Sequence, residues 1–231
     1  MHEDRFPAWL IDVGGEPALR AAPDCRSVDL EAGATRSAAQ LVASGLLAVE
    51  AGRLLVTAGA TAGGNRGRRL VLVVGEPGTI LPPLAGDERL EALMSCRITV
   101  ISRESLQRLL ELPLVAAAIV ESLSDGLRDR QDSIRACLHV RHQDRVRDKL
   151  IQLARLHGRV VPGGIRIDLA LTQKLLADMV GSARETVSLA LAELAREGFV
   201  RRDGHGYRLL VTPEELAEWP PAAAAEAAVA C

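Results

Sequence analysis

The sequence predicts an α+β protein in which an N-terminal antiparallel β-roll is followed by a long helix and a C-terminal winged helix-turn-helix. Up to about residue 103, short apolar runs alternate with glycine-bearing turns, which is typical of strands. Residues 114–138 carry apolar side chains at alternating spacings of three and four, which indicates a helix. Residues 171–212 give the order helix, glycine turn, helix and hairpin.

Length and charge narrow the class of protein. The 231 residues suffice for two modest domains or one large one, and with two Phe, two Trp and one Tyr the cores must be aliphatic. The net charge of −2 is unevenly spread: residues 142–212 hold 12 Lys and Arg against 8 Asp and Glu, a net charge of +4, and the rest of the chain has −6. A basic C-terminal third on an acidic body is compatible with nucleic-acid binding.

The four cysteines predict neither a disulfide framework nor a zinc site, because they lie far apart and form no CxxC pair. We expect Cys25, Cys96, Cys137 and Cys231 to be solitary thiols in a reducing cytosol. The N-terminus lacks a basic segment followed by an apolar run, and no apolar stretch reaches about 18 residues. The expected location is therefore the cytoplasm, with no membrane contact.

The β-roll is expected within residues 1–113, after a lead-in with a short helix around residues 7–13. A basic, glycine-rich segment at residues 59–69 predicts a long hairpin loop. Ser102 can cap a short helix that ends at Pro113. The predicted strands are residues 40–49, 53–57, 69–74 and 96–101.

A helix over residues 114–138 would be about 37 Å long at 1.5 Å per residue. It can pack on its own domain or against a copy of itself, and its narrow apolar seam favours self-pairing. We therefore expect residues 114–141 to form a dimerisation helix that ends in a hinge at residues 139–142. The seam consists of Val120, Leu123, Leu127 and Ile134, with Arg130 and Cys137 at the same spacing.

Residues 142–219 are expected to form the C-terminal domain, and the Pro- and Ala-rich residues 220–231 a disordered tail. The domain starts with an amphipathic helix at residues 143–157, which Gly158 ends, and a small hairpin follows at residues 160–169.

The helix-turn-helix itself begins at Thr172, an N-cap candidate for a short first helix. Gly181 is the turn residue, because glycine most easily adopts a left-handed backbone. Ser182 is expected to cap a second helix at residues 183–196, and a β-wing follows at residues 199–211.

The second helix offers side chains for reading DNA on the face opposite its apolar stripe. An Arg-Glu pair on a helix is usually a solvated surface feature, but the turn and wing around this pair favour DNA binding. Arg can donate two hydrogen bonds to O6 and N7 of guanine, and Glu can accept one from N4 of cytosine. The candidates are Arg184, Glu185, Ser188 and Leu189 for bases, Thr172, Gln173, Ser182 and Thr186 for phosphates, and His205 and Arg208 in the wing.

Residues 180–188, Val-Gly-Ser-Ala-Arg-Glu-Thr-Val-Ser, resemble the recognition-helix signature of the Crp/Fnr family. The resemblance is specific in the C-terminal third, and the order of β-roll, long helix, hinge and winged helix matches over most of the chain. It implies a β-roll of the cyclic-nucleotide-binding type, a homodimer on a palindromic operator, and base reading by Arg184 and Glu185. The sequence departs from the family at Leu189, where well-known members carry a second base-reading Arg, so Leu189 is a candidate for touching a thymine methyl group.

The same resemblance implies an effector pocket, for which the β-roll offers weak candidates. Glu76 can occupy the ribose position of a cyclic nucleotide and Arg89 the phosphate position, but Arg89 has no hydroxyl neighbour and Pro77 removes a backbone amide. We therefore expect a vestigial pocket and no cofactor. An iron–sulfur cluster needs clustered cysteines, whereas a single His or Cys ligand to haem would leave little trace in the sequence. His139 and His142 are expected to be polar hinge residues rather than metal ligands.

The predicted function is a sequence-specific DNA-binding transcriptional regulator that acts as a homodimer. The alternative is a winged-helix adaptor that contacts protein and binds no specific DNA. RNA polymerase is a further candidate partner of a regulator, although no motif marks a surface for it. An enzyme is not expected, and no catalytic or metal-binding residue is predicted, because the sequence lacks a glycine-rich phosphate loop and HExxH and GxSxG motifs.

Overall fold

The computed structural model describes residues 8–41, 45–59, 69–138 and 141–219. The chain divides into two compact units, Met1–Ile134 and Arg135–Cys231. The predicted loop at residues 59–69, apart from its two ends, the hinge residue His139, Cys231 and the predicted tail lie outside the described residues, as does the side chain of Cys137. None of the helices in the described ranges is long and apolar enough to cross a membrane.

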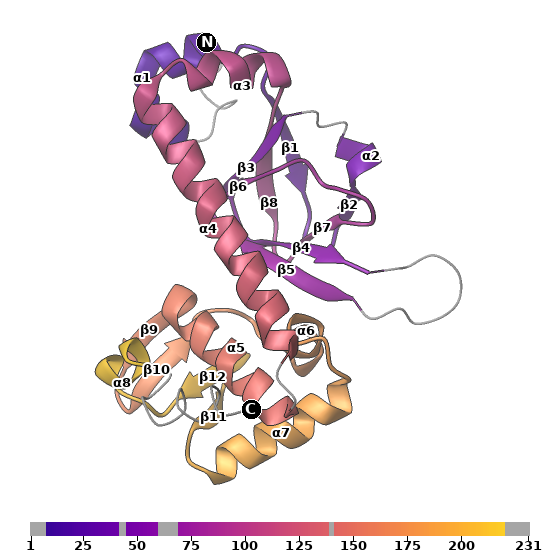
Figure 1. The fold of residues 1–231 in the computed structure, drawn as a ribbon, viewed down its shortest axis with the longest axis vertical. Helices are drawn as coiled ribbons and strands as arrows, with labels where there is room; N and C mark the ends of the chain where they lie inside the picture. Colours follow the sequence, from indigo (N-terminus) through magenta and orange to yellow (C-terminus); the bar gives the residue numbers. More distant parts are fainter. Residues whose placement is uncertain (1–7, 42–44, 60–68, 139–140, 220–231) are drawn as a thin grey trace. The chain divides into compact units, whose positions relative to one another are not determined.

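The first unit is built on two four-stranded antiparallel sheets (Figure 1). Its strands are β1 (Arg26–Leu30), β2 (Thr35–Ser37), β3 (Leu46–Ala51), β4 (Leu54–Ala58), β5 (Leu70–Gly75), β6 (Ile80–Leu81), β7 (Arg89–Ala92) and β8 (Cys96–Ile101). One sheet has the strand order β1-β8-β3-β6 and the other β2-β7-β4-β5. Successive strands thus alternate between sheets at several points, and the predicted antiparallel β-roll is confirmed.

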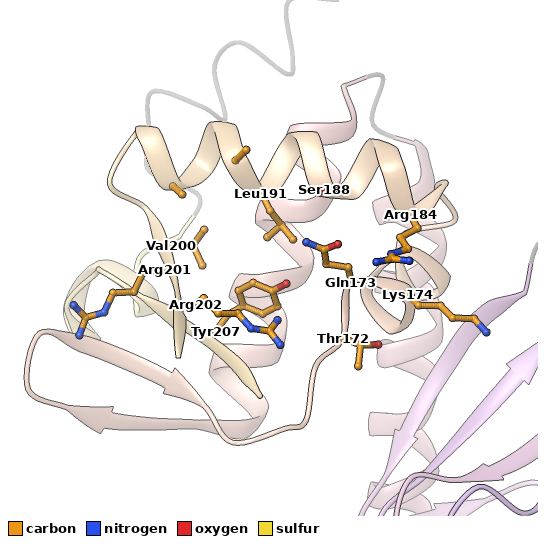
Figure 2. Close-up of a pocket in the computed structure, with 12 residues that line it drawn as sticks. Thr172, Gln173, Lys174, Arg184, Ser188, Leu191, Val200, Arg201, Arg202 and Tyr207 are labelled. Atoms are coloured by element: carbon orange, nitrogen blue, oxygen red, sulfur yellow. The ribbon is translucent and has the colours of Figure 1, made fainter. Parts of the chain in front are cut away.

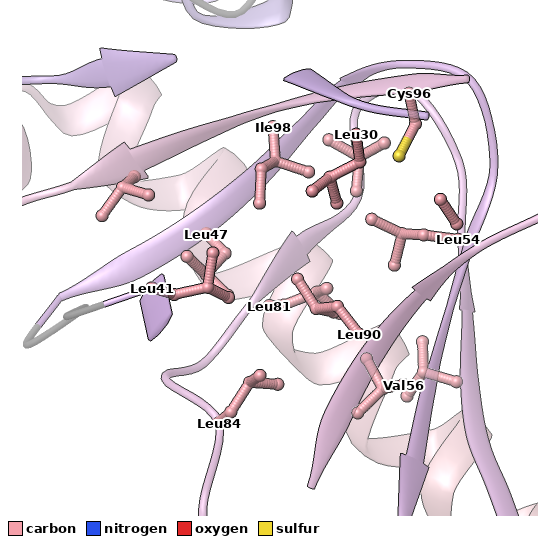
Figure 3. Close-up of a cluster of buried hydrophobic side chains, with 14 residues drawn as sticks. Leu30, Leu41, Leu47, Leu54, Val56, Leu81, Leu84, Leu90, Cys96 and Ile98 are labelled. Carbon is pink, nitrogen blue, oxygen red and sulfur yellow. The ribbon is translucent and has the colours of Figure 1, made fainter. Parts of the chain in front are cut away.

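The alternation of side chains along each strand gives this unit two apolar clusters, because successive side chains point to opposite faces of a sheet. Leu47 and Val49 of β3 join the cluster between the two sheets, which Figure 3 shows. Leu46 and Ala48 belong to a second cluster formed with helices. Those helices are α1 (Ala8–Ala21), α3 (Arg103–Leu110) and α4 (Pro113–Leu138).

The long helix α4 has two different apolar faces. Val115 and Ile119 are buried in the helical cluster, and the predicted seam residue Leu123 packs partly buried against the same cluster. Arg130 also faces its own domain: its guanidinium lies 2.6 Å from a carboxylate oxygen of Glu88, which is itself buried. The structure therefore corrects the placement of Arg130 in the seam. Leu114 is exposed at the start of the helix, and three further large apolar side chains are exposed along it: Val120 at 59%, Leu127 at 56% and Ile134 at 53%, each seven residues from the next.

The second unit is a helical layer on a four-stranded sheet with the order β11-β12-β10-β9. Its elements are α5 (His142–His157), β9 (Gly158–Val161), β10 (Gly164–Ile167), α6 (Gln173–Met179), α7 (Arg184–Arg196), β11 (Val200–Asp203), β12 (Gly206–Leu209) and α8 (Pro213–Ala217). Both α5 and α6 contact α7. These elements match the predicted winged helix-turn-helix, with α8 in addition.

Several elements differ from the prediction. The expected strand at residues 40–49 starts in a short helix, α2 (Ala38–Leu41), and extended structure begins only at Leu46. The expected helix at residues 7–13 is the start of the longer α1, which is kinked at Gly15. Strands β1, β2, β6 and β7 were not predicted, because they are short and carry few apolar residues in alternation.

Two cysteines are buried, Cys25 in the helical cluster and Cys96 between the sheets. Burial, together with the neighbouring Asp24 carboxylate, raises the pKa of the Cys25 thiol to about 11. Burial also raises the pKa of Cys96. Because the thiolate is the reactive form, neither side chain is poised for redox chemistry at neutral pH.

Replacing Leu47 with Ala is expected to lower the free energy of unfolding by about 2–5 kcal/mol, because the side chain is fully buried between the sheets. Urea unfolding at fixed protein concentration measures the change. The matched control is Leu110→Ala in α3, where the side chain is exposed and the expected change is within about 0.5 kcal/mol. Equal losses in the two variants would contradict the assignment of the core.

The native protein at pH 8 is expected to react with iodoacetamide at Cys25 and Cys96 at least about tenfold more slowly than the urea-unfolded protein, because burial and a raised pKa both suppress thiolate attack. Mass spectrometry of peptides after timed labelling gives each rate. Similar rates in the two states would show that these thiols are accessible.

Candidate nucleic-acid interface

The helix-turn-helix is held by local interactions that match the sequence prediction. The hydroxyl oxygen of Thr172 accepts a hydrogen bond from the Leu175 amide at 3.1 Å, so Thr172 is the N-cap of α6. Gly181 has a φ of +60°, the left-handed conformation expected of the turn residue. The Ser182 amide then donates to the carbonyl of Ala177, which closes the turn.

The start of the second helix differs from the prediction. Helix α7 begins at Arg184 with Ala183 at its N-cap position, and no side chain caps it. Ser182 is 8% exposed, and its hydroxyl oxygen lies 3.0 Å from Nδ1 of His142 at the start of α5. The expectation that Ser182 caps α7 is therefore wrong, because the hydroxyl turns inward to a tertiary partner. This position also keeps the hydroxyl away from the solvent face where a phosphate would lie.

Helix α7 presents a buried and an exposed face. Val187, Ala190, Leu191 and Leu194 are buried, which matches the predicted apolar stripe. Arg184 and Glu185 are exposed in the first turn, and Leu189 is 69% exposed. Ser188 and Thr186 are partly buried beside them. The four predicted base readers thus lie together in the first two turns of one helix, where a recognition helix meets base edges.

A groove of about 630 Å³ runs between the start of α6, the exposed side of α7 and the strands of the wing (Figure 2). No Asp or Glu is among the residues that line it. Its polar and basic lining includes Thr172, Gln173, Lys174, Arg184, Arg201 and Arg202. The groove is therefore electropositive, and it is bounded by the surface that the sequence assigned to DNA.

The side chains exposed on the wing differ in part from those predicted. Arg208 is used inside the domain: its Nε lies 2.8 Å from an Asp203 carboxylate oxygen, and Nη1 donates to the Pro162 carbonyl at 3.0 Å. Arg201 and Arg202 are exposed instead, and the Arg202 guanidinium stacks over the Tyr207 ring at 4.9 Å. The run Arg201-Arg202-Asp203 is visible in the sequence, but the sequence does not show which arginine pairs with Asp203. The pairing of β11 with β12 brings Arg208 to Asp203 and leaves Arg201 and Arg202 exposed.

His205 is exposed in the turn at the tip of the wing, where the prediction placed it. Lys174 is an exposed groove residue in the first turn of α6 that the sequence reasoning missed. Lys174 could have been predicted from its position directly after Thr172 and Gln173, because these two residues mark the helix start that faces the groove.

The candidate effector residues lie in the first unit and have local roles. The Glu76 carboxylate lies 2.6 Å from Nε of Arg53, and the Glu76 amide donates to the Thr79 hydroxyl at 3.0 Å in a tight turn. Arg89 is partly buried on β7, between Ser37 and Thr57 on the neighbouring strands. Among the described side chains, no group of three or more His, Cys, Asp or Glu could hold a metal ion.

Comparison with known proteins finds similarity that includes the domain that carries this interface. The Crp-like helix-turn-helix domain matches residues 144–219. The CRP-like cAMP-activated global transcriptional regulator of Mycobacterium tuberculosis is 30% identical over 122 residues, which are 52% of this chain and 54% of that protein. The global nitrogen regulator of Synechocystis is 35% identical over 92 residues, which are 40% of each chain. This chain therefore aligns with about half the length of the curated relatives or less.

Solved structures share the fold over nearly the whole chain. A mutant of CooA from Carboxydothermus hydrogenoformans superposes with a TM-score of 0.76 at 21% identity, covering 92% of this chain and 94% of that chain. The c-di-GMP-responsive global regulator CLP of Xanthomonas campestris gives a TM-score of 0.65 at 20% identity, covering 84% and 99%. The helix-turn-helix match confirms the resemblance to the Crp/Fnr family for residues 144–219, and the solved structures show a shared fold.

Proposed function

We propose that this chain, whose residues 144–219 belong to the Crp-like helix-turn-helix family, is a homodimeric transcriptional regulator that reads a palindromic DNA operator through α7. The observation that carries the proposal is the groove beside α7, which is lined by four basic side chains and no carboxylate. An adaptor that contacts protein would not need this concentration of positive charge, whereas phosphates require it.

Each exposed residue of α7 has a separate part in this proposal. Arg184 donates to guanine in the major groove, and Glu185 accepts from cytosine. Leu189, the most exposed apolar side chain of the helix, contacts a thymine methyl group. Phosphate contacts come from the helix start at Thr172 and Gln173, from Thr186, and from the wing.

The proposed dimer forms through α4. Val120, Leu127 and Ile134 repeat every seven residues along one exposed stripe, which is the spacing that pairs two helices in a coiled coil. Large apolar side chains that are more than half exposed at such a spacing indicate an interface that a single chain leaves uncovered. Two copies paired in this way would carry two α7 helices to successive major grooves, about 34 Å apart.

We further propose that the effector pocket is vestigial and that the protein binds its operator without a cyclic nucleotide. One relative is named as cAMP-activated. In this chain, however, the carboxylate that would meet the ribose is already ion-paired with Arg53. A second internal ion pair, Arg130 with Glu88, joins α4 to the β-roll. Both contacts favour a sensor domain that is fixed by its own side chains.

Selection from a random-sequence DNA library is expected to return an approximate palindrome without any added nucleotide, because the basic groove and the α4 stripe are already in place. Arg184→Ala should lower the affinity for the selected sequence by about 1–3 kcal/mol and relax the preference at one base pair in each half-site. Binding at a stated salt concentration, on the selected duplex and on single-base variants, measures both effects.

Arg36→Ala is the control for loss of a surface arginine, since Arg36 lies in the first unit and its side chain donates to the neighbouring backbone carbonyl of Thr35. Selection of no consensus, with weak and sequence-independent binding, would favour the adaptor alternative. An unchanged base profile for Arg184→Ala would remove Arg184 as a base reader.

Leu127→Asp is expected to weaken self-association at least about tenfold, because a carboxylate in a paired apolar seam loses its hydration. The same substitution at Leu156 on α5 is the control, since Leu156 is about as exposed but lies off the stripe. Sedimentation equilibrium of both variants gives the dissociation constants. A Leu127→Asp protein that associates like the Leu156→Asp protein would disprove pairing through α4.

A further inference from the structure

Helix α7 is tied at both ends to the start of α5. At the amino end, ring Nδ1 of His142 lies 3.0 Å from the hydroxyl oxygen of Ser182, the residue just before the N-cap of α7. At the carboxyl end, the side chain of Glu197, the C-cap residue of α7, accepts hydrogen bonds from the side chains of Gln143 and Arg147. His142 and Gln143 are the first two residues of α5. We call these contacts the two end ties of α7.

The amino-terminal tie takes the place of a local cap of the helix. Serine is among the best N-cap residues and alanine among the poorest, yet Ala183 occupies the N-cap position of α7. The hydroxyl of Ser182, one residue earlier, is buried and turned to His142. Helix α7 therefore begins without a side-chain cap, while the neighbouring serine makes a contact with α5.

The carboxyl-terminal tie also opposes the preference of an isolated helix. The carbonyl end of a helix carries partial negative charge, so a carboxylate at this end is unfavourable by itself. The Arg147 guanidinium pairs with the Glu197 carboxylate and also lies over the Phe199 ring, 5.2 Å from the ring centre. The contacts of Glu197 with α5 thus offset an unfavourable charge at the end of α7.

Two departures from local helix preference in one helix indicate a shared tertiary requirement, because local and global preferences usually agree in a sequence that specifies one structure. Helix α7 carries the proposed base readers, and a binding site works only when its side chains are held to within about 0.5 Å. Apolar burial fixes the rotation of α7 about its own axis. The direction of this axis is set at the two ends, because a helix held at one end alone can swing about it.

We propose that His142, Gln143 and Arg147 are positioning residues that fix the direction of the α7 axis for base reading. The groove beside α7 is lined by other residues, so these three act through Ser182 and Glu197. The inference rests on the proposed DNA-binding function and assigns part of its specificity to residues behind the recognition surface. Its consequence is that loss of either end tie lowers discrimination between DNA sequences more than general attraction to DNA.

The test measures the affinity of each variant for the operator that the wild-type protein selects from a random library, and for a duplex of scrambled sequence, at one stated salt concentration. The ratio of the two affinities reports base reading, because both duplexes share the attraction to phosphates. We expect His142→Ala and Ser182→Ala each to lower this ratio about fivefold, the equivalent of one typical hydrogen bond. The double variant should lose no more than either single variant, because both substitutions remove the same contact.

Two further variants examine the hydrogen bond and the opposite end. The side-chain amide in His142→Asn can donate or accept near the position of Nδ1 and should restore most of the ratio. Glu197→Ala should also lower the ratio about fivefold, although loss of a carboxylate strengthens general attraction to DNA. In combination with His142→Ala the two losses should multiply, because the ties lie at opposite ends of α7.

Thr212→Ala is the control for lost stability, since the Thr212 hydroxyl caps α8 by accepting a hydrogen bond from the Glu215 amide at 3.2 Å. This variant should lower the urea midpoint and leave the affinity ratio unchanged. A fall in the ratio equal to that of His142→Ala would show that lost stability alone explains the effect, and would overturn the inference.

The remaining outcomes distinguish the end ties from the recognition surface. An unchanged ratio for either His142→Ala or Glu197→Ala would overturn the inference and leave the proposed function intact. Losses for His142→Ala and Ser182→Ala that multiply in the double variant, or no recovery in His142→Asn, would also overturn it. A wild-type protein that selects no sequence would overturn both the inference and the proposed function.

Discussion

The packing of α7 against α5 and α6 is the constraint on which the rest of the proposed DNA-binding surface depends. Burial of Val187, Leu191 and Leu194 fixes the rotation of α7 about its own axis. Arg184 and Glu185 must then face outward, and the left-handed backbone of Gly181 sets the angle at which α6 meets α7. The same packing brings the start of α6 and the wing to either side of the exposed face. The basic groove is therefore a consequence of apolar burial on the other side of the helix.

Burial of one face also determines the direction of the other face in α4. This helix packs against the β-roll on one side, and its other side is the proposed dimer interface. Val115 and Ile119 are buried against the β-roll, so Val120, Leu127 and Ile134 are turned out together. The Arg130–Glu88 ion pair joins α4 to the β-roll near the end of this stripe. Removing one partner of such a buried pair costs more than the pair itself contributes, so the contact acts mainly to select one position of the helix. This ion pair links the β-roll to the helix that carries the proposed dimer interface.

The sequence predicted correctly those features that depend on residues close together in the chain. Thr172 and Gly181 act within a few residues of chain, so the cap of α6 and the turn were predicted correctly. Ser182 was wrong as a helix cap because its partner, His142, is 40 residues away and only the tertiary fold brings it near. Arg208 is occupied by Asp203, whereas the nearby Arg201 is not, since strand register sets ion pairs. The short strands of the β-roll escaped prediction because two to five residues carry little periodicity.

The most direct test of the account is the dependence of affinity on the distance between the two half-sites. In the proposed dimer, the two α7 helices should bind best when the half-sites lie one helical turn apart, about 34 Å. Inserting about five base pairs places the second half-site on the opposite side of the duplex and should abolish tight binding, and inserting about ten should restore part of it through DNA bending. Affinity that is indifferent to the spacing would contradict a rigidly paired dimer reading both half-sites.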